Sequence, residues 1–202
     1  MTEPPPGAGD GDLPDAEGMA QRLRDYRLDR FATTLQVLPE TREDIDFDPD
    51  NPDVGKFYVR APVQSLDDLK RWTGIPNDDI DHSKYTSHLK CVTVPGLGTV
   101  KGTELDPQLV ADAEHNVRFG YVDDKLLSNA FWKLIADGLL QRWRTINILM
   151  LLDLVVYDGQ TVTLRNTQTA FFRKVTMYPR GVISFQDDCK LIADTIENLA
   201  SP

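Results

Sequence analysis

The sequence predicts an α+β chain, mainly β with helices, that ends in a short parallel β-solenoid with a capping helix. Two observations support this fold class. A β-strand pattern occurs twice within 152–185 at an offset of 21 residues. A helical pattern of apolar residues covers 126–142, directly before the repeat. The spacing of apolar residues therefore changes from a helical period of 3.6 to a strand period of 2.

The repeat aligns 154–157 with 175–178 and 161–164 with 182–185, and each copy has a turn between its strands. Equivalent residues of stacked coils would lie ~4.8 Å apart, so opposite charges there are favourable. The predicted inward pairs are Leu154/Val175, Val156/Met177, Val162/Ile183 and Leu164/Phe185, continued by Phe171/Ile192 and Val175/Ile196. The predicted polar and aromatic neighbours are Asp153/Lys174, Arg173/Asp194 and Tyr157/Tyr178.

An antiparallel topology explains the same alternation. Asp158-Gly159 stands between two alternating runs, which is a strong signal for a β-hairpin. Segments 153–165 and 173–187 would then be two hairpins of a β-meander or β-sandwich. The sequence leaves both topologies open.

A solenoid of two coils and a fraction is short, because such units bury a core only by stacking. The 126–142 helix could cap one open end. The other end would need the C-terminus, an N-terminal segment or a second subunit. We therefore expect a homo-oligomer or another protein as the partner.

The chain divides by composition into four regions. These are a disordered acidic tail (1–16), an amphipathic helix (17–32), an α+β region (33–125) and the helix plus β-repeat region (126–202). In the amphipathic helix, Met19, Leu23, Tyr26 and Phe31 fall near helical spacing. This apolar stripe could dock on its own domain or on another subunit.

Several shorter elements are predicted in the α+β region. They are an acidic loop at 43–53, strands at 56–60 and 89–94, a helix at 65–73 that Ser65 caps, a Gly-rich turn at 95–102, and a helix at 105–117 with Pro107 in its first turn. Gly138, inside the 126–142 helix, suggests a close packing contact.

The formal net charge of −10 is concentrated in two segments, because residues 1–20 and residues 41–53 carry −5 each. The rest is nearly neutral and has no basic face, which argues against nucleic acid as a partner. No apolar run reaches the ~18–20 residues of a membrane span, and no secretory signal is recognisable. We expect a cytoplasmic protein with Cys91 and Cys189 reduced.

No motif identifies a reaction or a cofactor. His82, His88 and Cys91 match no zinc spacing, and the acidic run at Asp46, Asp48 and Asp50 lacks the glycine and glutamate of a calcium loop. Asp187 and Asp188 are adjacent and would point in different directions in an extended chain. We predict no cofactor and no metal, and the catalytic residues, if any, are unknown.

The sequence is therefore most consistent with a non-catalytic binding or assembly protein. The alternatives are a hydrolase or lyase that acts on a glycan, and a carbohydrate- or metal-binding module. The candidate interaction residues are Met19, Leu23, Tyr26, Phe31, Tyr157 and Tyr178.

Overall fold

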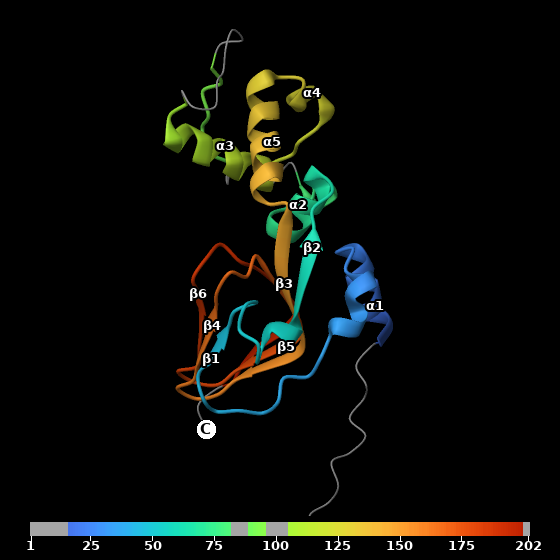
Figure 1. Ribbon diagram of the computed structural model, residues 1–202, viewed down its shortest axis with the longest axis vertical. Coiled ribbons are helices and arrows are strands. Elements are labelled where there is room, and N and C mark those ends of the chain that lie inside the picture. Colours follow the sequence, from blue (N-terminus) through green and yellow to red (C-terminus); the bar gives the residue numbers. More distant parts are fainter. Residues whose placement is uncertain (1–15, 82–88, 96–104, 200–202) are drawn as a thin grey trace, which may run out of the picture. The chain divides into compact units, whose positions relative to one another are not determined.

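The computed structural model (Figure 1) describes residues 16–81, 89–95 and 105–199. The chain divides into two units, Met1–Thr33 and Thr34–Pro202. Helices hold 35% of the chain and strands 28%, which confirms the α+β class. The helix content exceeds the strand content, so the expectation of a mainly β chain gave the helices too little weight. Residues 1–15 of the predicted tail and residues 96–102 of the predicted turn lie outside the described residues.

The first unit contains α1 (Ala16–Asp25) and nearly all of the 3-10 helix η1 (Asp29–Thr34), where one continuous helix was expected. The main chain shows why α1 ends. Arg27 has a φ of +54°, its N–H donates to the Arg24 carbonyl, and the Leu28 N–H donates to the Leu23 carbonyl. This is a Schellman motif, which ends a helix with a left-handed residue.

The second unit contains all the strands and most of the helices. Its helices are η2 (Gly55–Phe57), α2 (Leu66–Thr73), η3 (Asn77–Asp79), α3 (Pro107–Phe119), α4 (Asp124–Leu127) and α5 (Ala130–Arg142). Its strands are β1 (Ile45–Phe47), β2 (Tyr58–Pro62), β3 (Thr145–Val156), β4 (Thr161–Leu164), β5 (Thr169–Met177), β6 (Val182–Phe185) and β7 (Lys190–Asn198).

The strands form two sheets, and all pairs except β2–β3 are parallel. One sheet has the order β2-β3-β5-β7 and the other β1-β4-β6. The register follows the predicted offset of 21 residues, as in Leu154↔Val175↔Ile196 and Val162↔Ile183. The predicted hairpins are wrong for the described strands, because β3 and β4, like β5 and β6, follow each other in the chain but lie in different sheets.

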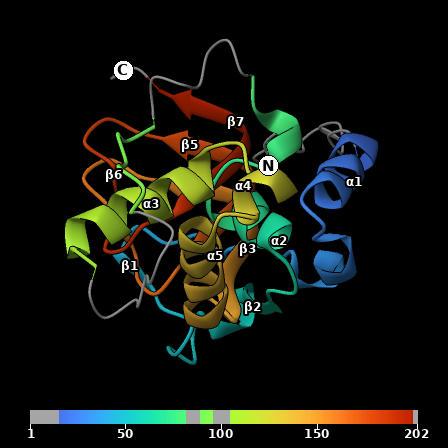
Figure 2. The same ribbon diagram turned by 90° about the horizontal axis from the view of Figure 1, so that it is seen from above.

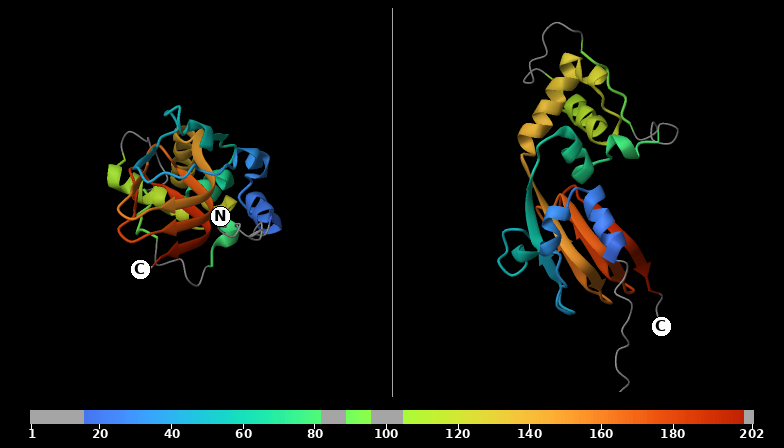
Figure 3. Two further views of the ribbon diagram at one scale, coloured as in Figure 1. Left: turned by 90° about the horizontal axis from the view of Figure 1, so that it is seen from below. Right: turned by 90° about the vertical axis from the view of Figure 1, so that its right-hand side faces the viewer.

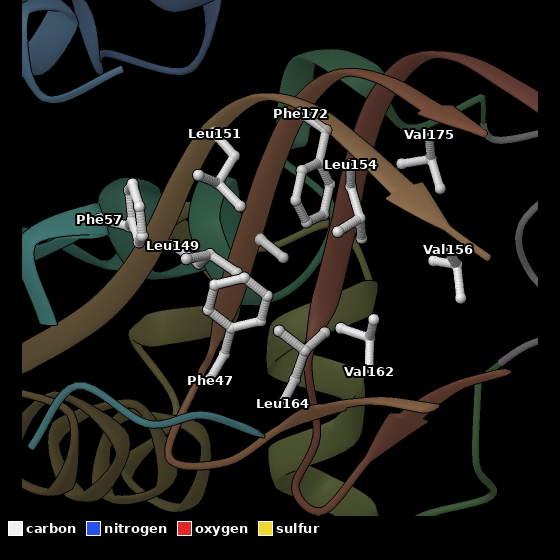
Figure 4. Packing of buried hydrophobic residues seen from close by; sticks show 11 residues of the cluster. Phe47, Phe57, Leu149, Leu151, Leu154, Val156, Val162, Leu164, Phe172 and Val175 are labelled. Atoms are coloured by element: carbon white, nitrogen blue, oxygen red, sulfur yellow. The ribbon is translucent and has the colours of Figure 1, made fainter. Parts of the chain in front are cut away.

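The main core lies between the two sheets (Figure 4). Its buried residues are Phe47, Phe57, Leu149, Leu151, Leu154, Val156, Val162, Leu164, Ala170, Phe172 and Val175. The β3, β4 and β5 members include five of the inward residues predicted from the repeat. Strand alternation therefore predicted the inward position of these five residues, whereas the predicted Met177 and Ile183 are half-buried and Phe185 is exposed.

The helices α2, α3, α4 and α5 gather at one end of β2 and β3 (Figures 1 and 2). α2 and α3 begin where expected, with Ser65 and Asp106 as N-caps. The predicted 126–142 helix is interrupted, because the Asn129 side chain accepts from the N–H groups of Phe131 and Trp132 and starts α5 anew. α5 does not cap the strands: β2 pairs with the outer edge of β3 instead, so the predicted capping helix is wrong.

Three local expectations are also corrected. Residues 89–94 form no strand, because the Asn116 side chain of α3 bonds both the N–H and the carbonyl of Lys90 in place of a neighbouring strand. The acidic segment is not entirely a loop, since β1 lies within it. A Cβ on Gly138 would meet nothing within 4 Å, so this glycine marks no close contact.

Two lysines bind main-chain carbonyls where α2 and α3 end. The Lys70 Nζ donates to the carbonyl of Gly120, the C-cap of α3, and to Asn77 Oδ1 at 2.7 Å. The Lys190 Nζ donates to the carbonyls of Arg71 and Gly74 at 2.8 Å each. Carbonyls at helix C-termini carry partial negative charge and attract cations. Desolvation lowers the pKa of both lysines from 10.5 to about 8.

This shift in pKa predicts a pH-dependent stability. Because the charged form of Lys190 is disfavoured only in the fold, its burial cost is complete below pH 8 and disappears as pH rises from about 8 to 10.5. We expect the unfolding free energy of the native chain, relative to Lys190→Met, to rise over this range in urea titrations. The neighbouring Cys189, whose pKa burial raises to about 12, is present in both proteins and cancels. Parallel pH curves for the two proteins would contradict the assignment.

Candidate interaction surface

The two sheets end in strands that are consecutive in the chain. β6 is an edge strand of the three-stranded sheet, and β7 is an edge strand of the four-stranded sheet. Figure 3 shows β7, in red, as the outermost strand of its sheet. In the described part of the chain, no strand pairs with the outer side of either one. We call this edge, formed by β6 and β7, the open end.

Apolar side chains are exposed at the open end because nothing follows them in the stack. In one column of the register, Leu154 and Val175 are fully buried, whereas Ile196 is 53% exposed. In another, Leu164 is 1% exposed and its neighbour Phe185 is 45% exposed. Further exposed apolar residues in or beside the last two strands are Tyr178, Val182 and Leu199. An apolar layer at a strand edge is typical of an interaction site.

On the opposite side of both sheets, earlier parts of the chain supply the outermost strands. β1 pairs with β4, and β2 pairs with β3. The buried amide of Gln160 donates to the carbonyls of Thr41 and Glu43, and its oxygen accepts from the N–H of Tyr157. The N–H of Thr161 donates to the Asp44 side chain at 2.7 Å. The acidic segment thus covers the turn that follows β3, and β1 and β2 are the outermost strands on this side of the two sheets.

Tyr157 and Tyr178 stack as the repeat predicts. Their ring centroids lie 5.6 Å apart at an interplanar angle of 19°, and the Arg42 guanidinium lies 5.3 Å from the Tyr157 ring centre. Desolvation and the side chain of Glu40 raise the pKa of the Tyr157 hydroxyl. These contacts give both rings a packing role between coils. A sugar-binding role for them stays a prediction.

Ion pairs also connect neighbouring strands, although not always between the expected residues. Asp153 and Lys174 are register partners, as predicted, but Asp153 accepts from the Arg173 guanidinium, with 2.8 Å to its Nε. Lys174 pairs with Glu197 at 2.8 Å. Arg173 thus pairs diagonally with Asp153, and its predicted pairing with Asp194 stays a prediction.

Arg180 forms a further pair with Asp158, one coil away. The Arg180 guanidinium lowers the pKa of the Asp158 carboxyl.

The acidic candidates bind neighbouring groups of the chain. Asp46 accepts from Arg165 Nε at 2.8 Å, and Asp50 pairs with Arg60 at 2.5 Å. Asp187 accepts from the Asn166 N–H at 2.9 Å. The carboxylates of the acidic segment therefore do not converge on a common point.

The metal-site candidates are only partly covered. His82 and His88 lie outside the described residues, and Cys91 is exposed. Among the residues that the structure describes, no three His, Cys, Asp or Glu side chains come close enough to hold a metal ion.

The sequence-predicted interaction residues fall in both units. Leu23 is buried in α1, and Met19, Tyr26 and Phe31 are half-buried in the first unit. Tyr157 and Tyr178 lie in the second unit, beside the turns that follow β3 and β5. Sequence reasoning did not single out the exposed Phe185 and Ile196. Their position in the last copy of the repeat was the available signal, because a last copy has no following neighbour.

Comparison with protein-family models, with curated proteins and with solved structures finds no match. None of the described helices is both long enough and apolar enough to cross a membrane. The function is therefore argued from the geometry of the open end and of the chain around it.

The hydrogen bonds of Gln160 can be used to test how strongly this side chain holds the acidic segment. Gln160→Ala removes the hydrogen bonds that the buried Gln160 amide makes with main-chain groups of Thr41, Glu43 and Tyr157, which costs ~1–3 kcal/mol. We expect urea unfolding to show a loss of this size. Gln141→Ala removes an exposed glutamine and should change the unfolding free energy by less than ~0.5 kcal/mol. Equal effects of the two substitutions would show that Gln160 does not fasten this segment.

Proposed function

We propose that this chain is a non-catalytic assembly protein, that its two sheets form a short β-solenoid, and that two copies associate through their open ends. The exposure of Phe185 and Ile196, at positions that are buried one coil earlier, carries the proposal. Burying these two side chains against another protein surface would stabilise the complex by ~25 cal/mol per Å² of apolar surface. The equivalent residues one coil earlier already have this contribution.

A second copy of this chain fits the open end for a geometric reason. Each coil presents one strand of either sheet, and its side chains match those of the neighbouring coil, as the Tyr157–Tyr178 stack and the Leu154–Val175–Ile196 column show. The last coil of another copy has the same width and the same spacing of strands. A two-fold axis would place β7 against β7 and β6 against β6, antiparallel, and would satisfy both free edges at once.

The asymmetry between the two ends limits the assembly to two copies. An open stack with two equal ends would add copies without limit and form a fibre. Here β1, β2 and the acidic segment cover the first coil. Association through the open end alone therefore closes as a dimer, which also protects the edge from uncontrolled strand addition.

The alternatives have weaker support. A glycan-cleaving enzyme needs two carboxylates that face one substrate, whereas Asp187 binds the Asn166 N–H and Asp188 binds Arg118. The amphipathic residues of α1 offer a second place for a partner protein, in a unit that is separate from the open end. A reducing, cytoplasmic setting suits the two free cysteines.

The test is the particle mass in solution. We expect light scattering to give twice the chain mass at micromolar concentrations and one chain mass for the double variant Phe185→Lys, Ile196→Lys. Val37→Lys is the matched control, since Val37 is a 66% exposed apolar residue away from the open end. The control should remain a dimer. A wild-type mass of one chain at all these concentrations would reject the proposal, and so would a dimer that survives the double substitution.

A further inference from the structure

A cavity of about 350 Å³ lies where α2 ends, beside α3 and the start of β7. It is lined by Thr73, Gly74, His115, Arg118, Phe119, Asp188, Cys189 and Lys190. Of these lining residues, Arg118 and Lys190 bear positive charge and Asp188 bears the only negative charge. The cavity shares Lys190 with β7 but none of the exposed apolar residues of the open end, so what it binds is a different question from assembly.

Several contacts hold the Arg118 guanidinium, but one of its nitrogen donors has no hydrogen-bond partner among the described residues. Its Nη2 donates to the Thr73 carbonyl at 2.7 Å, and its face lies 5.1 Å from the Phe119 ring centre and 5.3 Å from that of Trp143. Its side chain is only 12% exposed, and its Nε is buried with no hydrogen-bond partner in the described part of the chain. A buried donor without a partner is rare and leaves part of the hydrogen-bonding capacity of Arg118 unused.

The Asp188 carboxylate occupies the position where an acceptor contacts Arg118 Nη1. Its carboxylate lies 3.3 Å from Arg118 Nη1, which is long for a charge-assisted hydrogen bond, and its side chain is 82% exposed. The Asp188 carboxylate is thus a loosely held anion on the guanidinium. A ligand anion with better geometry could displace it toward solvent at little cost.

Lys190 adds a second positive charge to the lining. The Lys190 side chain is half-buried, and its ammonium donates to the main-chain carbonyls of Arg71 and Gly74. The His115 ring, which packs 4.7 Å from Phe119, completes the polar side of the cavity. Two cations around a partly enclosed space strengthen the local field, because solvent screens them less there than at an open surface.

We propose that this cavity binds the oxyanion group of a small molecule, either a phosphate or a carboxylate, with Arg118 as the principal contact and Lys190 beside it. Arginine suits both groups, because its planar donors match their oxygen pairs. Phe119 and the half-buried Cys189 supply an apolar wall for the remainder of the ligand. Asp188 competes with the ligand for the guanidinium.

The experiment is an NMR titration of the ¹⁵N-labelled full chain with inorganic phosphate and, separately, with acetate, each matched against sodium chloride of equal ionic strength. We expect saturable shifts of the Gly74, Arg118 and Lys190 amides with phosphate or acetate and none with chloride. The anion that saturates at lower concentration identifies the ligand group. Equal shifts with chloride, or no saturable shift with either anion, would overturn the proposal.

Two acid-to-amide variants provide the decisive comparison. Asp188→Asn removes the competing carboxylate and should tighten anion binding several-fold. Asp187→Asn makes the same change of charge one residue away, outside the cavity lining, and keeps an oxygen that can accept from the Asn166 N–H. It should leave the affinity close to wild type. Equal affinities of the two variants would overturn the role of Asp188, and with it the proposal.

Arg118→Gln should abolish the saturable shifts. Arg118 also donates to the Thr73 carbonyl, so its substitution can destabilise the fold. The urea unfolding midpoint of the Arg118→Gln variant is therefore measured as well. If this variant does not fold, the comparison of Asp188→Asn with Asp187→Asn decides the proposal.

Discussion

A parallel stack of strands cannot end without leaving one row of main-chain groups and one apolar layer without a neighbour. This constraint governs the second unit. On one side β1 and β2 are the outermost strands, and the buried Gln160 amide fastens the acidic segment to the turn that follows β3. On the other side β6 and β7 are the outermost described strands, and Phe185 and Ile196 are exposed there.

The helices are attached to this stack through polar groups as well as apolar ones. A Cβ on Gly74 would lie 2.1 Å from the Arg118 carbonyl, so only glycine lets the end of α2 approach α3 this closely. Lys190, at the start of β7, then binds the carbonyls at that helix end. The end of α2 thus meets α3 and the start of β7. This contact brings Arg118 and Lys190 together from distant parts of the sequence and forms the cationic cavity.

The repeat could be predicted from the sequence because its signals are local. Alternation and two turns at a fixed offset were enough to predict the register of Leu154 with Val175 and the stacking of Tyr157 on Tyr178. Elements that depend on distant partners could not be predicted in this way. β1 is three residues long and acidic, and it exists as a strand because it pairs with β4.

The same limit applies to the candidate sites. Residues 89–94 have the alternation of a strand, but the Asn116 side chain forms the hydrogen bonds with the Lys90 main chain that a neighbouring strand would form. The cavity has no local sequence pattern of its own, and the only sequence signal for the open end is its place in the last copy of the repeat. The central claim, that two open ends pair, is tested most directly by residue-level hydrogen exchange of β7. The account predicts that the β7 amides that do not bond β5 exchange slowly at high protein concentration and quickly on dilution. Rapid exchange of these amides at every concentration would contradict it.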